Sequence, residues 1–389
     1  MRSYQHVTPP LRIFSGENSL ASLERELQRL GIERAVLFCG ATLGQPGSPV
    51  DLIRSALGNR LAAVFTGVKA HSPVPAVEVA TQALREVDAD GAIAVGGGSA
   101  IVTARGASIL LAEGREPADL STRQDANGKM TSPRLEAPKI PQIIIPTTPT
   151  TAIVKAGTAL LDPATKMRMA MFDPKTRAQS VFIHPALVGS APEELIISAS
   201  LNTLAMSIEG LMSRNGDPIA DGQLIHALRL AFQRLGNRTE LSDPAARADL
   251  VVAAMLCGQG TDHSGAGVTT VLGHAVGGHF GVENGVANAI MLPHALRFNA
   301  AHAEAGLAKI GAALGLPADD PAALLEAVID ALARLTTGLG VPSRLRDVGV
   351  AQEDFAKIAE HAMKDWFLRG NPRPVNNAAQ LQQLLVGAW

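Results

Sequence analysis

Up to about residue 190, short apolar runs alternate with longer stretches whose apolar positions recur every three or four residues. The short runs have the length of buried strands, and the longer stretches have the period of amphipathic helices. The expected strand and helix pairs are ERAVLFCG with SPVDLIRSALGNRL, AAVFTGV with PVPAVEVATQALREV, and DGAIAVGGGS with AIVTARGASILLAEG. This alternation is typical of a parallel α/β sheet, in which ligands bind beyond the carboxyl ends of the strands.

The pattern changes after about residue 190, where strand signals stop and helical patterns take over. The helical stretches are EELIISASLNTLAMSIEGLMSR, GQLIHALRLAFQRLG, ARADLVVAAMLCGQG, DPAALLEAVIDALARL and EDFAKIAEHAMKDW. We therefore expect an α/β domain over residues 1–190 and an all-α domain over residues 191–389. Residues 121–139 are polar, contain Gly and Pro, and are expected to form a surface loop.

The composition is that of a globular protein whose partner is a small molecule. Of the 389 residues, 47% are hydrophobic and 18% are charged, which is enough apolar material for a large core. The net charge of −2, with Lys and Arg scattered, leaves no basic surplus for nucleic acid or an anionic membrane. Cys39 and Cys257 are far apart, which favours a reducing compartment over a disulfide framework. The N-terminus lacks the apolar stretch of a signal peptide, and no run approaches the roughly 18 apolar residues of a membrane span, so a cytoplasmic location is expected.

Candidate chemistry begins with the stretch AIAVGGGSA, which puts a glycine triplet between a predicted strand and a predicted helix. The residues are Gly96, Gly97, Gly98 and Ser99. Residues without a Cβ let the backbone approach a pyrophosphate closely, and the free N–H groups at a helix start attract such an anion. A tight turn without a ligand explains the triplet equally well, because the pattern is neither G-x-G-x-x-G nor a P-loop.

A second apolar run, in IIIPTTPTT, ends in a cluster of threonines. The threonines are Thr147, Thr148, Thr150 and Thr151. Hydroxyl groups at the carboxyl end of a strand can bond phosphate, ribose or carboxamide oxygens, but threonines are also common in strands and turns that bind nothing. The spacing alone does not decide between these readings.

Five stretches in order give the chain a family resemblance along essentially its whole length. They are LRIFSGENSLASLERELQRLGIERAVLF, DGAIAVGGGSAIVTARG, IPTTPTT, LNTLAMSIEG and LGHAVGGHFGVENGVANAIMLPHALRFN. In this order they resemble the iron-containing alcohol dehydrogenase superfamily, and Asn202 with the NPRP element at Asn371 resembles its maleylacetate reductase branch. The resemblance implies a Rossmann-like dinucleotide-binding domain, a helical catalytic domain of the dehydroquinate synthase-like fold, and hydride transfer between a nicotinamide and a small carbonyl or alcohol in a cleft between the domains.

The resemblance also implies which residues bind the cofactor. Gly96 to Ser99 match the pyrophosphate turn of the family. The other implied contacts are Thr147, Thr148 and Thr151 on the nicotinamide and phosphates, Arg168 where relatives have a cofactor-side lysine, and Leu187 near the adenosine. Val102 departs from the Asp of the family pattern, and Gly40 stands where many relatives place an Asp that excludes a 2′-phosphate. The cofactor is therefore expected to be NAD or NADP.

In the family a divalent ion is held by an Asp and a His four residues apart on one helix and by two later His. This chain has Asn202 and Met206 at the first pair and Thr270 and Asn284 at the later pair. Neutral amides, a hydroxyl and a thioether are poor ligands for Fe²⁺ or Zn²⁺. We therefore expect no tightly bound divalent metal, and we expect these four positions to line the substrate cleft.

The resemblance keeps one histidine beside the nicotinamide, His274, which is expected to protonate the alkoxide as hydride arrives. A core or capping histidine is the alternative. His279 is expected to line the same cleft. Glu209 is read first as a packing or hydrogen-bonding residue, and His263 lies in a glycine-rich stretch that could reach the substrate.

The leading hypothesis is thus an NAD(P)-dependent alcohol dehydrogenase or carbonyl reductase that works without a bound metal. The alternative is a non-redox nucleotide-binding protein, or an inactive homologue, that keeps the fold. A lyase of the dehydroquinate synthase type or a glycerol-phosphate dehydrogenase would need metal ligands that these positions lack. Relatives also suggest a homodimer formed through an edge of the N-terminal sheet, and the sequence names no substrate.

Overall fold

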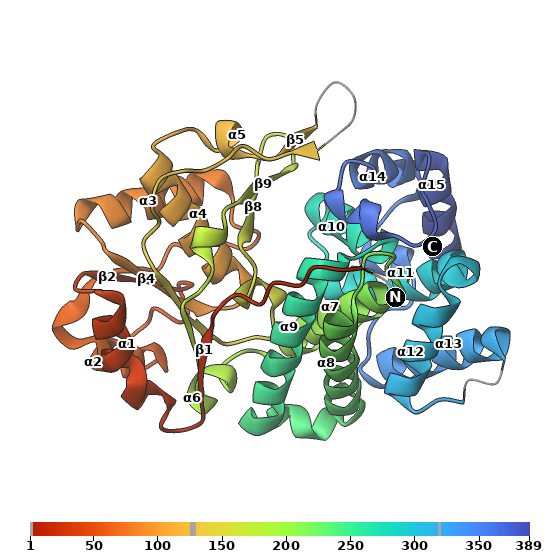
Figure 1. The fold of residues 1–389 in the computed structure, drawn as a ribbon, viewed down its shortest axis with the longest axis horizontal. Coiled ribbons are helices and arrows are strands. Elements are labelled where there is room, and N and C mark those ends of the chain that lie inside the picture. The colour runs from red at the N-terminus through yellow and green to blue at the C-terminus, as the bar shows by residue number, and fades with distance from the viewer. Residues whose placement is uncertain (1–2, 125–129, 318–319) are drawn as a thin grey trace. The chain divides into compact units, whose positions relative to one another are not determined.

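The computed structural model describes residues 3–124, 130–317 and 320–389, and the chain forms two compact units (Figure 1). One unit is Pro9–Ala191, and the other combines Pro192–Trp389 with the N-terminal segment that ends at Thr8. The sequence pattern put this segment in the α/β domain. In the structure it belongs with the helical unit, because His6 is bonded to Asp217 there.

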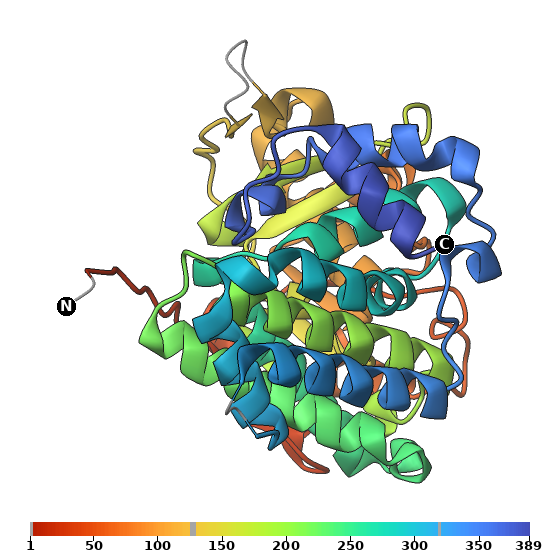
Figure 2. The ribbon, with the colours of Figure 1, turned by 90° about the vertical axis from the view of Figure 1, so that its right-hand side faces the viewer.

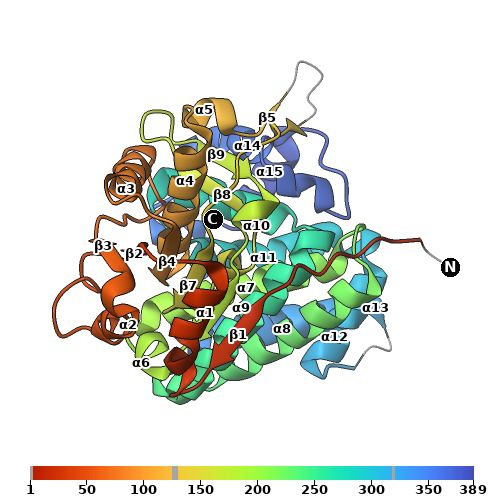
Figure 3. The same cartoon turned by 60° about the vertical axis from the view of Figure 1, so that its left-hand side comes forward.

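The α/β unit is built on a six-stranded sheet in which every strand pair is parallel, as the sequence predicts (Figure 3). The strand order is β1-β10-β7-β4-β2-β3, so β4 and β7 are neighbours in the middle of the sheet. The strands are β1 (Arg12–Ser15), β2 (Ala35–Phe38), β3 (Leu61–Phe65), β4 (Gly91–Gly96), β7 (Gln142–Pro146) and β10 (Ser180–Ile183). Strands β2, β4, β7 and β10 are buried along their whole length, which explains their continuous apolar runs.

Helices cover this sheet, and two small antiparallel hairpins accompany it. The helices are α1 (Leu23–Leu30), α2 (Val50–Leu57), α3 (Val74–Glu86), α4 (Gly98–Glu113), α5 (Pro117–Leu120) and α6 (Pro185–Val188). The hairpins pair β5 (Arg123–Gln124) with β6 (Met130–Thr131) and β8 (Gly157–Leu161) with β9 (Arg168–Phe172). The expected surface loop at 121–139 therefore contains a short strand pair, and its residues 125–129 lie outside the described residues.

The second unit contains helices and no strand among its described residues, as predicted (Figure 2). Helix α8 packs against both α7 and α9, and α11 packs against both α7 and α10. The helices are α7 (Glu193–Met212), α8 (Pro218–Gly236), α9 (Pro244–Ser264), α10 (Val268–Phe280), α11 (Asn284–Asn299), α12 (Glu304–Leu314), α13 (Pro321–Gly338), α14 (Phe355–Ala362) and α15 (Ala378–Gly387). A 3-10 helix, η9 (Trp366–Gly370), follows α14.

Helix α7 is more apolar than the sequence pattern predicts. Its 20 residues, with a mean hydropathy of 1.4 over the most apolar window, are long and apolar enough to cross a membrane by length and composition alone. However, 83% of that window is buried inside the protein, as in the core helix of a helical bundle. Helix α7 also carries the buried polar residues Thr203, Ser207 and Glu209.

Candidate active site

The glycine turn lies where β4 ends and α4 begins. Gly96 is the last residue of β4 and has a φ of +144°, a backbone conformation that side chains disfavour. Gly97 is the N-cap of α4 and supplies no side-chain hydrogen bond to the helix, which then continues with Gly98 and Ser99. Helix α4 therefore begins without a side-chain cap, and its first N–H groups are placed as in an anion-binding helix start.

The threonine turn lies directly beside the glycine turn, because β7 is the neighbour of β4. The N–H of Thr147 donates to the carbonyl of Gly96 at 3.1 Å. A Cβ on Gly97 would come within 2.7 Å of Thr148 Oγ1, and a Cβ on Gly98 within 3.2 Å of Thr150 Oγ1. The two turns predicted from separate parts of the sequence thus meet, and a side chain at Gly97 would force Thr148 to move.

Three other predicted cofactor residues lie in different surroundings. Thr151 begins the 3-10 helix η3 (Thr151–Ile153), directly after Thr150. Arg168 is the first residue of β9, in the β8–β9 hairpin, and is half-buried. Leu187, in α6, is fully buried in the core cluster beneath the sheet, so a direct contact with a ligand would require this core to open.

In the helical unit, three of the four positions that match the family's metal ligands are bonded to protein groups. Asn202 Nδ2 lies 3.5 Å from Met206 Sδ one turn along α7, and Asn202 Oδ1 accepts from Asn288 Nδ2 of α11 at 2.9 Å. Thr270 Oγ1, on α10, donates to Glu209 Oε2 at 2.6 Å. The fourth position, Asn284, begins α11, and its Oδ1 is buried without a hydrogen-bond partner among the described residues.

Glu209 has a definite role in holding α10. Its carboxylate accepts from the N–H groups of Thr269 at 2.6 Å and Thr270 at 3.1 Å, both in the first turn of α10. The N-cap of α10 is Gly267, which has no side chain to accept a hydrogen bond. The carboxylate of Glu209, on α7, therefore caps α10 in its place. Burial raises the pKa of Glu209, while the hydrogen bonds from Thr270, Thr269 and Gly267 oppose that shift.

Asn371 completes the capping of α10. Its Oδ1 accepts from the N–H of Val268 at 3.2 Å, and its amide pairs with that of Asn299 through bonds of 3.0 Å and 2.8 Å. The NPRP element, which entered the sequence analysis only as a mark of resemblance, therefore has a structural function. Asn371 and Glu209 together fix the helix that carries Thr270 and His274.

We expect Glu209→Ala to destabilise the protein by about 3 kcal/mol or more, because it leaves two N–H groups and one hydroxyl buried without their acceptor. The measurement is chemical denaturation followed by circular dichroism. The matched control is Glu304→Ala, which removes an exposed carboxylate from the first turn of α12 and should change stability by no more than about 0.5 kcal/mol. Equal, small effects for the two variants would contradict the capping role.

The predicted catalytic residue His274 is held by a carboxylate that the sequence analysis did not identify. His274 Nδ1 lies 2.7 Å from Asp365 Oδ2, and both side chains are 21% exposed. Asp365 Oδ1 accepts from the N–H of Phe367 at 3.0 Å and so caps η9. With Nδ1 engaged by the carboxylate, Nε2 is the nitrogen of His274 that remains for a substrate.

Asp365 was missed because the helical pattern EDFAKIAEHAMKDW was read as one helix, in which Asp365 looked like an ordinary polar position. In the structure α14 ends at Ala362, and Asp365 follows it at the start of η9. The pair spans 91 residues of sequence, so no local spacing signals it. The only sequence signal was its place shortly before the NPRP element.

His279 lies in the last turn of α10, the helix that also carries His274, but has different neighbours. Its Nδ1 is 2.9 Å from the carbonyl of Ala275, so Nδ1 carries the proton, and its buried Nε2 has no hydrogen-bond partner among the described residues. The His361 ring lies beside it, with 4.5 Å between the ring centroids. Burial, and then the neighbouring His279, lower the pKa of His361. His279 therefore lies in a histidine pair and has an acceptor nitrogen available.

Comparisons with known proteins agree over the whole chain. Residues 10–185 match the family described as iron-containing alcohol dehydrogenase, and residues 196–389 match the Fe-containing alcohol dehydrogenase family, C-terminal. Maleylacetate reductase 1 of Cupriavidus pinatubonensis is 29% identical over 97% of this chain and 95% of its own. Lactaldehyde reductase of Escherichia coli (strain K12) is 27% identical over 96% of this chain and 97% of its own.

The fold agrees as well. A crystal structure of 1,3-propanediol oxidoreductase superposes with a TM-score of 0.90 at 24% identity, with 100% of each chain covered. The expected resemblance, including the likeness to maleylacetate reductases, is confirmed. The chain belongs to the iron-containing alcohol dehydrogenase family of oxidoreductases.

Proposed function

We propose that this protein is an NAD(P)-dependent reductase of small carbonyl compounds that uses the His274–Asp365 pair in place of a metal ion. The observation that carries the proposal is the 2.7 Å contact between His274 Nδ1 and Asp365 Oδ2. It leaves Nε2 as the donor nitrogen and puts a carboxylate where it stabilises the protonated ring. A dehydrogenase without a Lewis acid needs such a donor for the oxygen on which charge develops.

The α/β unit would bind the nucleotide. The uncapped start of α4, at Gly97 to Ser99, would hold the pyrophosphate with its N–H groups, and the hydroxyls of Thr148 and Thr150 border that turn. A bound nicotinamide supplies the hydride to a carbonyl, or accepts it from an alcohol. Gly40 offers no carboxylate against a 2′-phosphate, so both NAD and NADP are candidates.

The residues at the family's metal positions do not fit an iron or zinc ion. Thr270 donates its hydroxyl proton to Glu209, and the amide oxygen of Asn202 accepts from Asn288. Met206 offers a thioether, which prefers softer metals. A stable Fe²⁺ or Zn²⁺ site needs anionic or imidazole ligands, and these positions supply neither. We therefore propose that the reaction requires no metal at these positions.

Besides His274, the helical unit holds buried acceptor atoms that a polar ligand could bond. Asn284 and Asn288 have buried amide oxygens without partners among the described residues, and the Nε2 of His279 is in the same condition. Unpaired buried polar atoms are costly, so they mark places where water or a polar ligand completes the bonding. We propose that these acceptor atoms take hydrogen bonds from hydroxyl groups of the substrate or from water, while the proton for the carbonyl oxygen comes from His274. Thr270 is less suited to this role than the sequence suggested, because its hydroxyl is committed to Glu209.

The substrate class follows from the family and the donor set. The relatives are named as reductases of maleylacetate and lactaldehyde, and we propose a small carbonyl compound or the corresponding alcohol here. Without a Lewis acid, an activated carbonyl is the better substrate. We further propose a cytoplasmic homodimer that pairs through β1 or β3, the edge strands of the sheet, and light scattering of the purified protein tests the dimer.

The experiment is a fluorescence titration with NADH and NADPH, followed by turnover assays with a panel of small aldehydes and keto acids. The proposal expects saturable binding of one or both nucleotides and loss of the reduced cofactor with at least one carbonyl. Tight binding with no turnover on any panel member, in either direction, would instead favour a non-redox nucleotide-binding protein. Absence of binding would contradict the nucleotide site itself.

A further inference from the structure

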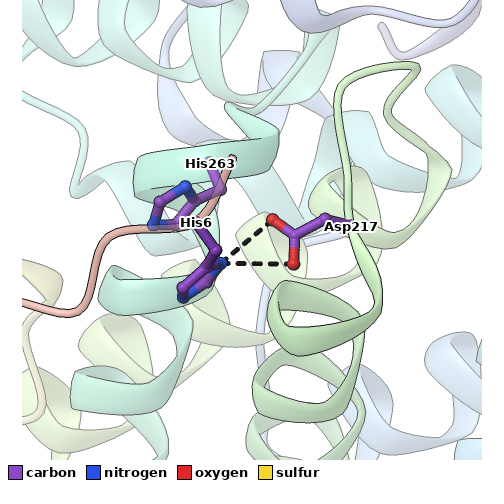
Figure 4. Close-up of side chains that lie close together, drawn as sticks. All are labelled: His6, Asp217 and His263. Carbon is purple, nitrogen blue, oxygen red and sulfur yellow. Dashed lines mark hydrogen bonds and ion pairs between the residues drawn. The ribbon is translucent and has the colours of Figure 1, made fainter. Parts of the chain in front are cut away.

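A second cluster of ionisable side chains lies in the helical unit, formed by His6, Asp217 and His263 (Figure 4). His6 belongs to the N-terminal segment, Asp217 is the N-cap of α8, and His263 lies in the last turn of α9. The sequence pattern predicts that His263 lies in a glycine-rich loop. The structure corrects this reading, because His263 is helical and its Nε2 is 3.2 Å from the carbonyl of Val7.

The three side chains offer one ligand atom each, and these atoms all lie within 4.8 Å of one another. His6 Nδ1 is 3.0 Å from Asp217 Oδ2 and 3.2 Å from Oδ1. The His6 and Asp217 side chains are only 5% and 3% exposed. Ligand bonds of about 2.0–2.2 Å around a tetrahedral ion place neighbouring ligand atoms roughly 3.3 Å apart, so the ligand atoms here lie near the spacing that an ion needs, although one ring must change its orientation.

The carboxylate of Asp217 is held in a fixed position in which it can act as an anionic ligand. Its Oδ1 accepts from the N–H groups of Ile219 at 2.9 Å and Ala220 at 3.0 Å, which fixes the carboxylate at the start of α8. The second oxygen, Oδ2, is not used by the helix cap and faces His6.

The two imidazole rings are stacked, with 3.7 Å between their centroids and 19° between their planes. Stacked rings cannot both direct an in-plane lone pair at one ion, so binding requires His263 to turn away from His6. His263 is half-buried at the C-terminal end of α9, where the chain leaves the helix at Gly265 with a φ of +72°. On binding, His263 would exchange its 3.2 Å contact with the carbonyl of Val7 for a bond to the ion.

We propose that His6, Asp217 and His263 form a binding site for one divalent transition-metal ion, with Zn²⁺ as the best fit. Two imidazoles and one carboxylate suit Zn²⁺ and the similar ions Co²⁺ and Ni²⁺, with water in the remaining position. The ion would join the N-terminal segment to the ends of α8 and α9, and so act as a structural clamp. The expectation of no tightly bound metal rests on Asn202, Met206, Thr270 and Asn284, none of which belongs to this cluster.

The test is calorimetric titration of the chelator-treated full-length chain with Zn²⁺, and with Co²⁺ followed by visible absorption. We expect one ion per chain, and at least about a tenfold weaker affinity in His6→Gln and in His263→Gln. The matched control is His226→Gln, an exposed histidine on α8, which should bind as the unmodified chain does. The His361→Gln variant tests whether the ion binds instead to the pair formed by His279 and His361.

Two results would overturn the site. One is a chelator-treated chain that binds neither ion at millimolar concentration. The other is binding that stays unchanged in both His6→Gln and His263→Gln, or that falls only in His361→Gln. Because the readout is metal binding, the outcome is independent of whether the protein reduces carbonyls. A melting temperature that rises with Zn²⁺ in the unmodified chain, but not in His6→Gln, would further support the clamp.

Discussion

Replacement of His274 by alanine is expected to lower turnover by about 100-fold to 10,000-fold, with the affinity for NAD(P)H little changed. In the proposed mechanism His274, held at Nδ1 by Asp365, gives a proton from Nε2, and no Lewis acid compensates for its loss. The measurement is steady-state kinetics with the best carbonyl of the panel, alongside nucleotide titration. The control is His302→Ala, an exposed histidine in the same unit, which should retain full activity.

Asp365→Asn tests how His274 is positioned. The amide keeps the shape but removes the carboxylate that holds Nδ1 of His274, so turnover should fall by at least about tenfold while the affinity for NAD(P)H stays little changed. A purely structural role for Asp365, as the cap of η9, would lower stability without this specific loss of turnover. Near-normal turnover in His274→Ala would transfer the donor role to His279 or to solvent.

Gly97→Val is expected to weaken nucleotide binding by at least about 100-fold, or about 2.7 kcal/mol, while the chain stays folded. The sequence alone suggested that the new side chain would enter the phosphate position. The structure gives a further reason, because a Cβ at Gly97 would lie 2.7 Å from Thr148 Oγ1 and force the two turns apart. Binding is measured by NADH and NADPH fluorescence, and folding by circular dichroism.

Gly236→Val is the matched control for that variant. Gly236 ends α8, a Cβ there meets no atom within 4 Å, and the residue belongs to the other unit. It should bind nucleotide as the unmodified chain does. If Gly97→Val were folded and bound NAD(P)H with unchanged affinity, the pyrophosphate could not lie on this turn.

The fold could be predicted from the sequence because each strand, helix and turn is marked by a pattern of neighbouring residues. Buried parallel strands such as β4 and β7 are continuous apolar runs, and each is followed at once by its glycine or threonine turn. The pairing of these turns then follows from the neighbouring positions of β4 and β7 in the sheet. Strand β1 was not predicted, because its four residues at the sheet edge have no apolar run to mark them.

The candidate site could be predicted only in part from the sequence, because its interactions join residues far apart in the chain. Asp365 meets His274 across 91 residues, and His6 meets Asp217 across 211. The capping of α10 by Glu209 and Asn371 comes from a helix and a loop outside α10, since Gly267 has no side chain to offer. Hydrophobic periodicity does not carry such information, because these are polar residues whose partners are set by tertiary packing.

The neutral side chains at the metal positions show what sequence could and could not establish. The sequence alone indicates that Asn202 and Thr270 are poor ligands for Fe²⁺ or Zn²⁺. Only the structure shows that their polar atoms are engaged, by Asn288 and by Glu209. These hydrogen bonds are what supports the proposal that no metal is bound at these positions.

The most direct test of metal-independent reduction is turnover of chelator-treated protein, assayed with NAD(P)H and the best panel carbonyl, before and after addition of Fe²⁺ or Zn²⁺. It is done in the unmodified chain and in His6→Gln, so that an ion at the N-terminal cluster cannot be mistaken for a catalytic one. We expect both proteins to keep their turnover within about twofold in all conditions, since no metal ion takes part in the step. Turnover that is lost on chelation and restored by one equivalent of Fe²⁺ or Zn²⁺ in both proteins would contradict the account.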